Sequence, residues 1–293
     1  DEIIFADYDR TWGTYGIVLD SNGLNYQGDD DSYDVEYGTD GQDVHIVYSG
    51  ATNGWIPILD KTVEDVPAAP GNENGIFGYG STGSLTAITN LISNVGVVAA
   101  DVAGVGSARQ SLAACEYGGD KGIFGYGNAS PATAVTNLVS NVGVVSADVT
   151  GVGTIRINLA ACSYGDDKGI FGYGEGPVSM TNLVSNAGVA STDVTGVGTA
   201  RTLLQACEYG GDKGIFAYGN DGSLTALSNL VSNAGVVATD VTGVGTARSY
   251  LAACSYGDDK GIFGYGNSGP AVSITNLVSN AGVVATDTTG VGT

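Results

Sequence analysis

An arginine and an aspartate recur once per period along the last three quarters of this 293-residue chain. A guanidinium can pair with a carboxylate through two parallel hydrogen bonds. The arginines are Arg109, Arg156, Arg201 and Arg248, and the matching aspartates are Asp148, Asp193, Asp240 and Asp287. Because the pair returns in every period, we predict a structural Arg–Asp contact that fastens one repeated unit to the next.

The same pattern allows a second interpretation, a set of equivalent ligand pockets with one in each unit. A tyrosine follows each copy of the repeated phenylalanine, and its ring can stack on a sugar, as in propeller lectins. The alternative is that these tyrosines pack between units with their hydroxyl groups satisfied. The residues are Tyr79, Tyr126, Tyr173, Tyr218 and Tyr265.

The four cysteines also keep one place in successive periods: Cys115, Cys162, Cys207 and Cys254. A disulfide requires Cα atoms within about 7 Å, and equivalent positions approach that closely only in a tight solenoid or near a propeller axis. Each cysteine follows small residues, which favours a reduced, buried residue on an inner strand. Metal binding would require nearby histidines or CxxC pairs, and the array has neither.

Catalytic residue sets are hard to assemble from this composition. His45 is the only histidine and lies in an alternating segment, so no catalytic triad or zinc site can be built around it. A glycoside hydrolase needs two carboxylates across a cleft, and none of the acidic residues departs from the repeat in a way that singles out a pair. Copper oxidases built on kelch propellers need histidine ligands, which the array lacks. We therefore predict no enzyme and no cofactor.

The net charge of −21 limits the partners that the chain can bind. Nucleic acids and anionic membranes attract clustered lysine and arginine, and no basic patch occurs here. No run of 18 apolar residues occurs either, so no membrane insertion is expected.

The densest acidic cluster comprises Asp29, Asp30 and Asp31 with Asp34 and Glu36. Carboxylate oxygens are ligands for hard cations, but the spacing matches no known calcium loop. A cation site and a solvated turn are therefore both open interpretations.

A glycine-rich core, GIFGYG or GIFAYG, marks each repeat. It begins at Gly75, Gly122, Gly169, Gly214 and Gly261, at steps of 45 to 47 residues. A period this regular is typical of repeat architectures, in which each unit buries its apolar face against its neighbours. Apolar runs of four to eight residues, bounded by Gly, Asp, Asn or Pro, predict four short strands per unit and no helix.

The order of elements in one unit resembles the kelch repeat. Arg156 is followed by the LAAC strand, by a turn at Asp167-Lys168 and by the strand Ile170–Gly174. Gly-Tyr-Gly replaces the paired glycines of that family, and its outer tryptophan is absent. The resemblance implies a β-propeller, whose blades have four strands in about this length.

We therefore predict an all-β chain with three parts: a small β-rich attachment or oligomerisation module at 1–62, an acidic linker at 63–73 and a repeat domain at 74–293. The repeat domain would be a kelch-like β-propeller of about five four-stranded blades. The array contains five copies of the second, third and fourth strands but only four of the first. An open β-solenoid and a larger, truncated propeller therefore remain alternatives.

The amino-acid sequence of the repeats resembles that of tail and tail-fibre proteins of marine and cyanobacterial bacteriophages. The likeness is carried by GIFGYG, by TNLVSNAGVVATDTTGVGT and, in the N-terminal part, by YSGATNGW from Tyr48 to Trp55. It implies a structural protein of the virion, extracellular and oligomeric, with a trimer favoured. Its partners would be other tail proteins and a host-surface glycan.

Between the second and third strands, each unit carries a stretch that differs from the others. These stretches begin at Ser81, Asn128, Glu175, Asn220 and Asn267. Loops that vary on a constant frame are where recognition is usually carried, so we predict binding there. A secreted or cell-surface lectin-like propeller that binds carbohydrate is the alternative function.

Overall fold

The computed structural model describes residues 1–7, 9, 11–29, 35–59 and 74–290, and it divides the chain into two units, Asp1–Gly71 and Asn72–Thr293. The predicted linker at 63–73 and most of the acidic cluster, from Asp30 to Asp34, lie outside the described residues. In the described part, no helix is long and apolar enough to cross a membrane.

The described part of the N-terminal unit is a small β-structure with one short helix, α1 (Trp12–Tyr15). One antiparallel sheet has the order β1-β4-β5, and a second pairs β2 with β3. Alternate residues of β4 are buried, and Tyr26 packs beside them with its hydroxyl 2.5 Å from that of Tyr37. The strands are β1 (Glu2–Ala6), β2 (Ile17–Leu19), β3 (Val35–Tyr37), β4 (Asp43–Tyr48) and β5 (Trp55–Leu59).

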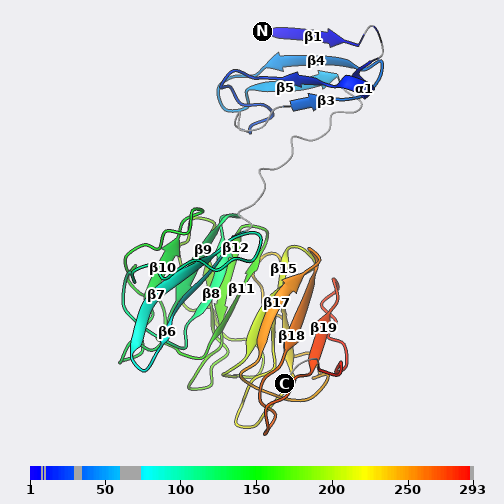
Figure 1. Cartoon of the computed structure of the whole chain (residues 1–293). Coiled ribbons are helices and arrows are strands. Elements are labelled where there is room, and N and C mark those ends of the chain that lie inside the picture. Colours follow the sequence, from blue (N-terminus) through cyan, green and yellow to red (C-terminus); the bar gives the residue numbers. More distant parts are fainter. Residues whose placement is uncertain (8, 10, 30–34, 60–73, 291–293) are drawn as a thin grey trace. The chain divides into compact units, whose positions relative to one another are not determined.

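The second unit contains five antiparallel sheets, one for each glycine-rich core (Figure 1). The first sheet has two strands, β6 (Gly75–Ser81) and β7 (Leu85–Ile92). Each later sheet has three strands and a further segment that joins the third strand through isolated bridges, such as Thr136 with Val149. The three-stranded sheets are β8 (Ala113–Tyr117), β9 (Lys121–Gly125) and β10 (Thr136–Val139); β11 (Ala160–Tyr164), β12 (Lys168–Gly172) and β13 (Thr181–Val184); β14 (Gln205–Tyr209), β15 (Lys213–Ala217) and β16 (Ser228–Val231); and β17 (Ala252–Tyr256), β18 (Lys260–Gly264) and β19 (Thr275–Val278).

The prediction of an all-β chain is confirmed at this level, and the described part of the array contains no helix. The GGDK and GDDK turns join first to second strands as expected, with Tyr117 opposite Lys121 in the first such hairpin. The first sheet lacks a strand equivalent to β8, as the count of repeated segments predicts.

Successive sheets pack face to face in chain order, so that β8 contacts β11, β11 contacts β14, and β14 contacts β17. Side chains alternate along a strand, which gives each sheet two different faces. In the third sheet, the Phe171 side chain and the Cβ position of Gly169 lie on the side that faces the preceding sheet. We call this side the phenylalanine face. Cys162, Ile170 and Gly172 point toward the following sheet and define the cysteine face.

A phenylalanine inserted against a tyrosine closes each junction between sheets. The rings of Tyr126 and Phe171 lie 5.3 Å apart in an edge-to-face arrangement, a favourable geometry for aromatic pairs. Gly125 permits this approach, since a Cβ built there would lie only 2.6 Å from Phe171 Cζ. The same aromatic pair recurs at all four junctions, between Tyr79 and Phe124, Tyr126 and Phe171, Tyr173 and Phe216, and Tyr218 and Phe263.

Candidate functional site

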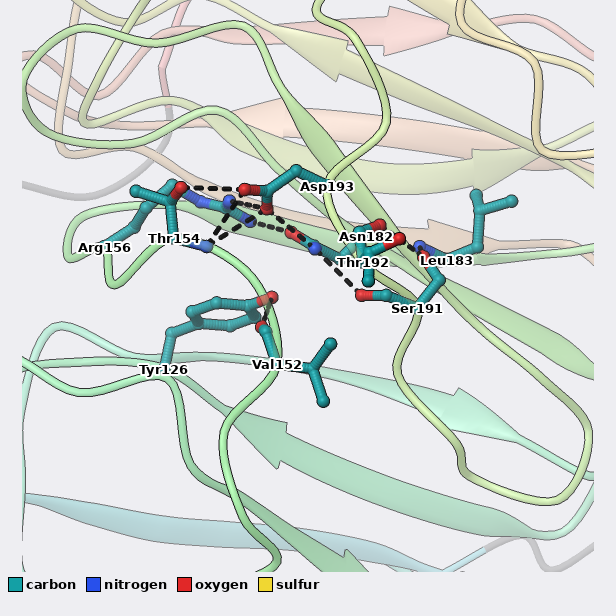
Figure 2. A network of polar contacts seen from close by, with 9 residues as sticks. All are labelled: Tyr126, Val152, Thr154, Arg156, Asn182, Leu183, Ser191, Thr192 and Asp193. Carbon is teal, nitrogen blue, oxygen red and sulfur yellow. Dashed lines mark hydrogen bonds and ion pairs between the residues drawn. The ribbon is translucent and has the colours of Figure 1, made fainter.

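A buried arginine, Arg156, lies at the centre of a network of polar contacts in the array (Figure 2). Arg156 Nη2 donates to Asn182 Oδ1 at 2.5 Å, and Nη1 lies 3.4 Å from Asp193 Oδ1. Thr154 donates to the same carboxylate from its amide and its hydroxyl. The Arg156 side chain is almost fully buried, so its charge depends on these protein groups in place of water.

The guanidinium also joins two units. Its carbon lies 4.6 Å from the ring centroid of Tyr126, in the preceding unit, which is within the range of a cation–π contact. The Arg156 carbonyl accepts a hydrogen bond from Gly127 of that unit. Figure 2 shows the Tyr126 ring below Arg156, with its hydroxyl donating to Val152 O at 3.1 Å. The junction is thus held by one side chain that has partners on both sides.

The other predicted Arg–Asp positions repeat this arrangement with small differences. Arg201 Nη1 lies 3.6 Å from Asp240. At Arg109 the contact to the aspartate runs through Ser107, whose hydroxyl donates to Asp148 and whose carbonyl accepts from Arg109. Thr246 joins Arg248 to Asp287 in the same way.

The tyrosines of these junctions are not open to a ligand. Tyr126, Tyr173 and Tyr218 are fully buried, and an arginine covers each ring. Burial raises the pKa of Tyr126 and Tyr173 to about 12, so both hydroxyls remain protonated donors. Packing between units therefore accounts for them, and sugar stacking at these rings does not.

The pKa values of the aspartates in this network predict how the stability of the array depends on pH. Partial burial alone would raise the pKa of Asp193, but hydrogen bonds from Thr154 and Asn182 outweigh it, and the pKa lies below its usual value. A carboxyl with a lowered folded-state pKa stabilises the fold above its unfolded pKa of about 3.9 and loses that contribution as the pH falls through the folded pKa. We expect thermal stability to fall below about pH 4, and Asp193→Asn to flatten this dependence. An unchanged acid profile in that variant would contradict the assignment.

The inner strands line a cavity of about 960 Å³ in the array. All four cysteines lie along it, together with Glu116 and Glu208. Burial, followed by the charge of Glu208, raises the pKa of Glu116. Sequence reasoning missed this pair; the signal was that glutamate and serine alternate at this position in successive units. Among the described residues, no group of three or more His, Cys, Asp or Glu side chains is placed to hold a metal ion.

The cysteines form a column in which Cys115, Cys162 and Cys207 each pack against the next unit. A Cβ built at Gly169 would lie 2.5 Å from Cys115 Sγ, and Gly214 meets Cys162 in the same way. All four thiols are free. The prediction that all are buried is wrong for Cys254, which is exposed because no described sheet covers the cysteine face of the last unit, and Cys115 is only partly buried.

We therefore expect one fast and two very slow thiols when the folded protein is titrated with a thiol reagent. Burial raises the pKa of Cys207 to about 12 and that of Cys162 well above its usual value, so both remain protonated and unreactive at neutral pH. Cys254 should react first, and Cys254→Ser should remove the fast phase. Equal rates for all four thiols would contradict this arrangement.

The predicted recognition loops lie beside the chain that leads into each inner strand. Asn128 pairs with Gln110, Asn220 with Thr202, and Asn267 with Ser249. Glu175 accepts a hydrogen bond from Asn158 Nδ2 at 3.0 Å. Ser81 ends β6 in the first unit, which has no such inner strand. The structure thus brings four of the five loops to the same end of the inner strands.

A row of four residues in left-handed backbone conformation runs past these loops. Their φ angles lie between 53° and 58°, and backbone hydrogen bonds of 3.0 to 3.2 Å link each to the next. The residues are Ser111, Asn158, Leu203 and Tyr250. They line a small cavity of about 140 Å³. We call this row with the adjacent loops the variable rim. In the sequence, the row is marked only by a residue that differs from unit to unit between similar flanking residues.

Comparisons with known proteins leave the family open. The sequence matches no protein-family model and no curated protein. Among solved structures, the chain is similar to a fungal alcohol oxidase of the AA5 family in complex with copper, with 12% sequence identity and a TM-score of 0.47. The match covers 75% of this chain and 63% of that one.

This likeness corrects the expectation that the chain is no enzyme, because the matched structure is that of an enzyme. At this identity and TM-score, the match carries no argument for an oxidase activity in this chain.

Proposed function

We propose that the chain is a structural component of a virion tail or tail fibre, and that the variable rim of its array recognises a host-surface glycan. The sequence resemblance of the repeats to phage tail and tail-fibre proteins supports this class of protein. In this proposal each sheet of the array, with the segment that bridges its last strand, is a blade of a kelch-like β-propeller. The N-terminal unit attaches the array to other tail proteins as an oligomer, and the protein is extracellular.

The left-handed row is the observation that carries the recognition role. A non-glycine residue in this conformation costs about 1–2 kcal/mol relative to glycine. The chain has 48 glycines and places them at most of its other positive-φ positions. Here it keeps a hydroxyl, an amide, an aliphatic group and a phenol instead, which indicates that the side chains themselves are needed.

The chemistry of the rim suits a carbohydrate. Tyr250 is 70% exposed and offers an aromatic face on which a sugar ring can stack. Asn158, which is half-buried and separated from Tyr250 in the row by Leu203, supplies an amide donor and acceptor. Gln205, on the wall of the same small cavity, supplies another. Rigid backbone holds all of these groups, which limits the entropy lost on binding.

Binding of the intact particle, or of the full chain, to host cells and to a glycan array tests the proposal. Tyr250→Gly removes the ring and relieves the left-handed backbone, so we expect stability to be unchanged or slightly raised while binding falls at least about tenfold. Exchanging 128–133 and 220–223 for the shorter loop 175–177 should also weaken binding with little cost in stability.

Val236→Glu is the matched control: Val236 is exposed on the hairpin that follows β16, at the opposite end of this strand from the 220–223 loop, and the substitution is expected to leave binding unchanged. If all rim variants bind as the parent does, the recognition role is wrong. Binding of glycan by a chain that never enters a particle would favour the secreted lectin-like alternative.

A further inference from the structure

The four residues of the left-handed row meet at one small cavity, which we call the rim cavity. Its volume is about 140 Å³, and Ser111, Asn158, Leu203 and Tyr250 all line it, although each belongs to a different unit of the array. The row therefore forms a single site to which four units contribute, and not one site for each unit.

We propose that the rim cavity binds the terminal residue of a glycan, and that this residue is an uncharged 6-deoxy sugar whose methyl group lies against leucine side chains. The biological meaning of the site rests on the recognition role proposed above, whereas its binding chemistry follows from the residues that line it.

The volume of the rim cavity limits the ligand to about one sugar residue. Pockets for drug-sized molecules usually have volumes of about 300–1,000 Å³, and a cavity of about 140 Å³ is much smaller. A terminal residue can enter such a cavity end-on, while the rest of the glycan extends over the adjacent loops. Two of these loops pair with residues directly before the row, through Asn128 with Gln110 and Asn220 with Thr202.

The apolar wall of the rim cavity selects the substituent of the sugar. Four of the eight lining residues are leucines: Leu112, Leu159, Leu203 and Leu204. A hydroxyl group placed against them would lose its hydrogen bonds to water without replacement, whereas a methyl group gains by leaving water. Leu203 has a φ of 58°, so the chain keeps an aliphatic side chain there in a strained conformation.

The polar part of the lining suits the ring hydroxyl groups of the same sugar. Ser111, Asn158 and Gln205 offer a hydroxyl and two amides as donors and acceptors. Asn158 Nδ2 donates to Glu175 at 3.0 Å, which holds the amide with its oxygen as the acceptor for a sugar hydroxyl. Tyr250 is 70% exposed and adds a ring face that is open to solvent.

The charge of the ligand is limited by the same lining. None of the eight residues is charged, so an ionised group inside the rim cavity would be desolvated without a partner, which is costly. The Glu175 carboxylate beside the row adds repulsion for an anionic sugar. An uncharged sugar is therefore favoured over uronic acids, phosphorylated sugars and amino sugars.

NMR titration of the full chain with two matched pairs of sugars tests the proposal. One pair is methyl α-L-rhamnoside and methyl α-L-mannoside, and the other is methyl α-L-fucoside and methyl α-L-galactoside. Within each pair, the sugars differ only in carrying a methyl or a hydroxymethyl group at the same carbon. In at least one pair, the 6-deoxy sugar should bind at least about tenfold more tightly. Its ring methyl group should receive more saturation from the protein than its O-methyl group.

Leu203→Asn tests the leucine wall. Asparagine is similar in size to leucine and tolerates a left-handed backbone, so folding should be retained. Because one cavity serves four units, this single substitution should remove the preference and lower the affinity for the 6-deoxy sugar at least about tenfold. Val189→Asn is the matched control: Val189 is 65% exposed on the hairpin that follows β13, at the opposite end of this strand from the 175–177 loop. This variant should bind as the parent does.

Two results would overturn the proposal. The first is that neither 6-deoxy sugar binds more tightly than its partner, including the case in which neither binds at all. The second is a preference that persists in Leu203→Asn.

Failure of the recognition role gives a different result. A preference for the 6-deoxy sugar, in a chain whose particle does not bind host cells, would keep the assignment of the rim cavity and refute that role. Host binding that depends on Tyr250, with the two sugars of each pair bound alike, would do the reverse.

Discussion

Replacing Arg201 with alanine is expected to lower the stability of the array by about 3–5 kcal/mol, the usual cost of removing one partner from a buried charged set. The guanidinium is fully buried, bonds Asn229 at 2.7 Å and lies over the ring of Tyr173. Its loss leaves Asn229 Oδ1 and the Asp240 carboxylate without their cation and opens the junction between two units. The midpoint of thermal unfolding should fall by roughly 10 °C or more.

Lys213→Ala is the matched control for this experiment. Lys213 also pairs with an aspartate, Asp212, once per unit, but its side chain is 39% exposed. An exposed pair contributes about 0–1 kcal/mol, so this variant should unfold close to the parent. Arg201→Lys distinguishes charge from shape: it should remain destabilised, since an ammonium cannot reach Asn229 and cover Tyr173 together. Similar midpoints for Arg201→Ala and Lys213→Ala would contradict the junction role.

Truncating Phe216 to alanine is expected to cost about 3–5 kcal/mol, as for other fully buried aromatic residues. The ring is fully buried, its centroid lies 5.1 Å from that of Tyr173, and it packs directly over Gly172. The facing residue, Gly172, has no side chain that could fill the cavity left behind. Denaturant unfolding followed by tyrosine fluorescence measures the loss.

The chain supplies its own control at the same repeat position. Phe77→Ala removes an identical ring that is 62% exposed, so in dilute solution it should change stability by no more than about 0.5 kcal/mol. Equal losses for Phe77→Ala and Phe216→Ala would show that burial between sheets is not what makes this residue important.

The order of the strands was predictable because the same order of segments recurs in five repeats. Short apolar runs between turn residues predicted the first three strands of each unit, and the missing first segment predicted that the sheet of β6 and β7 lacks an inner strand. The predicted fourth strand forms only isolated bridges, such as Thr89 with Val102. The Arg–Asp positions were also visible, since charges that recur with the fold must meet a recurring partner. The N-terminal unit has no internal repeat, and composition alone could not arrange its five strands.

Burial at the ends of the array could not be predicted, because the local sequence does not contain it. Strands β11 and β17 have the same sequence, AACSY, yet β11 is mostly buried and β17 is mostly exposed. The difference lies in the neighbouring sheet, so Cys162 is covered and Cys254 is not. A prediction made for the repeat as a whole fails wherever a unit lacks a neighbour.

The variable rim was found only in part. The loops at Asn128 and Asn220 stood out because their lengths and residues change. The left-handed row did not, since a serine or leucine carries no signal for positive φ; only backbone geometry shows that Ser111 and Leu203 share a conformation. The shared cavity of Glu116 and Glu208 was hidden for a similar reason, as these residues lie two periods apart in the sequence.

The identical junctions have a consequence for the gene. Each one joins a tyrosine, a phenylalanine and an arginine drawn from adjacent periods, so the in-frame loss or duplication of one whole period would recreate the same contacts at the new boundary. Because energies in such arrays depend mainly on nearest neighbours, the number of units can change by recombination between copies without any compensating substitution. The rim residues travel with their units, so each such event also reorders the surface that they form.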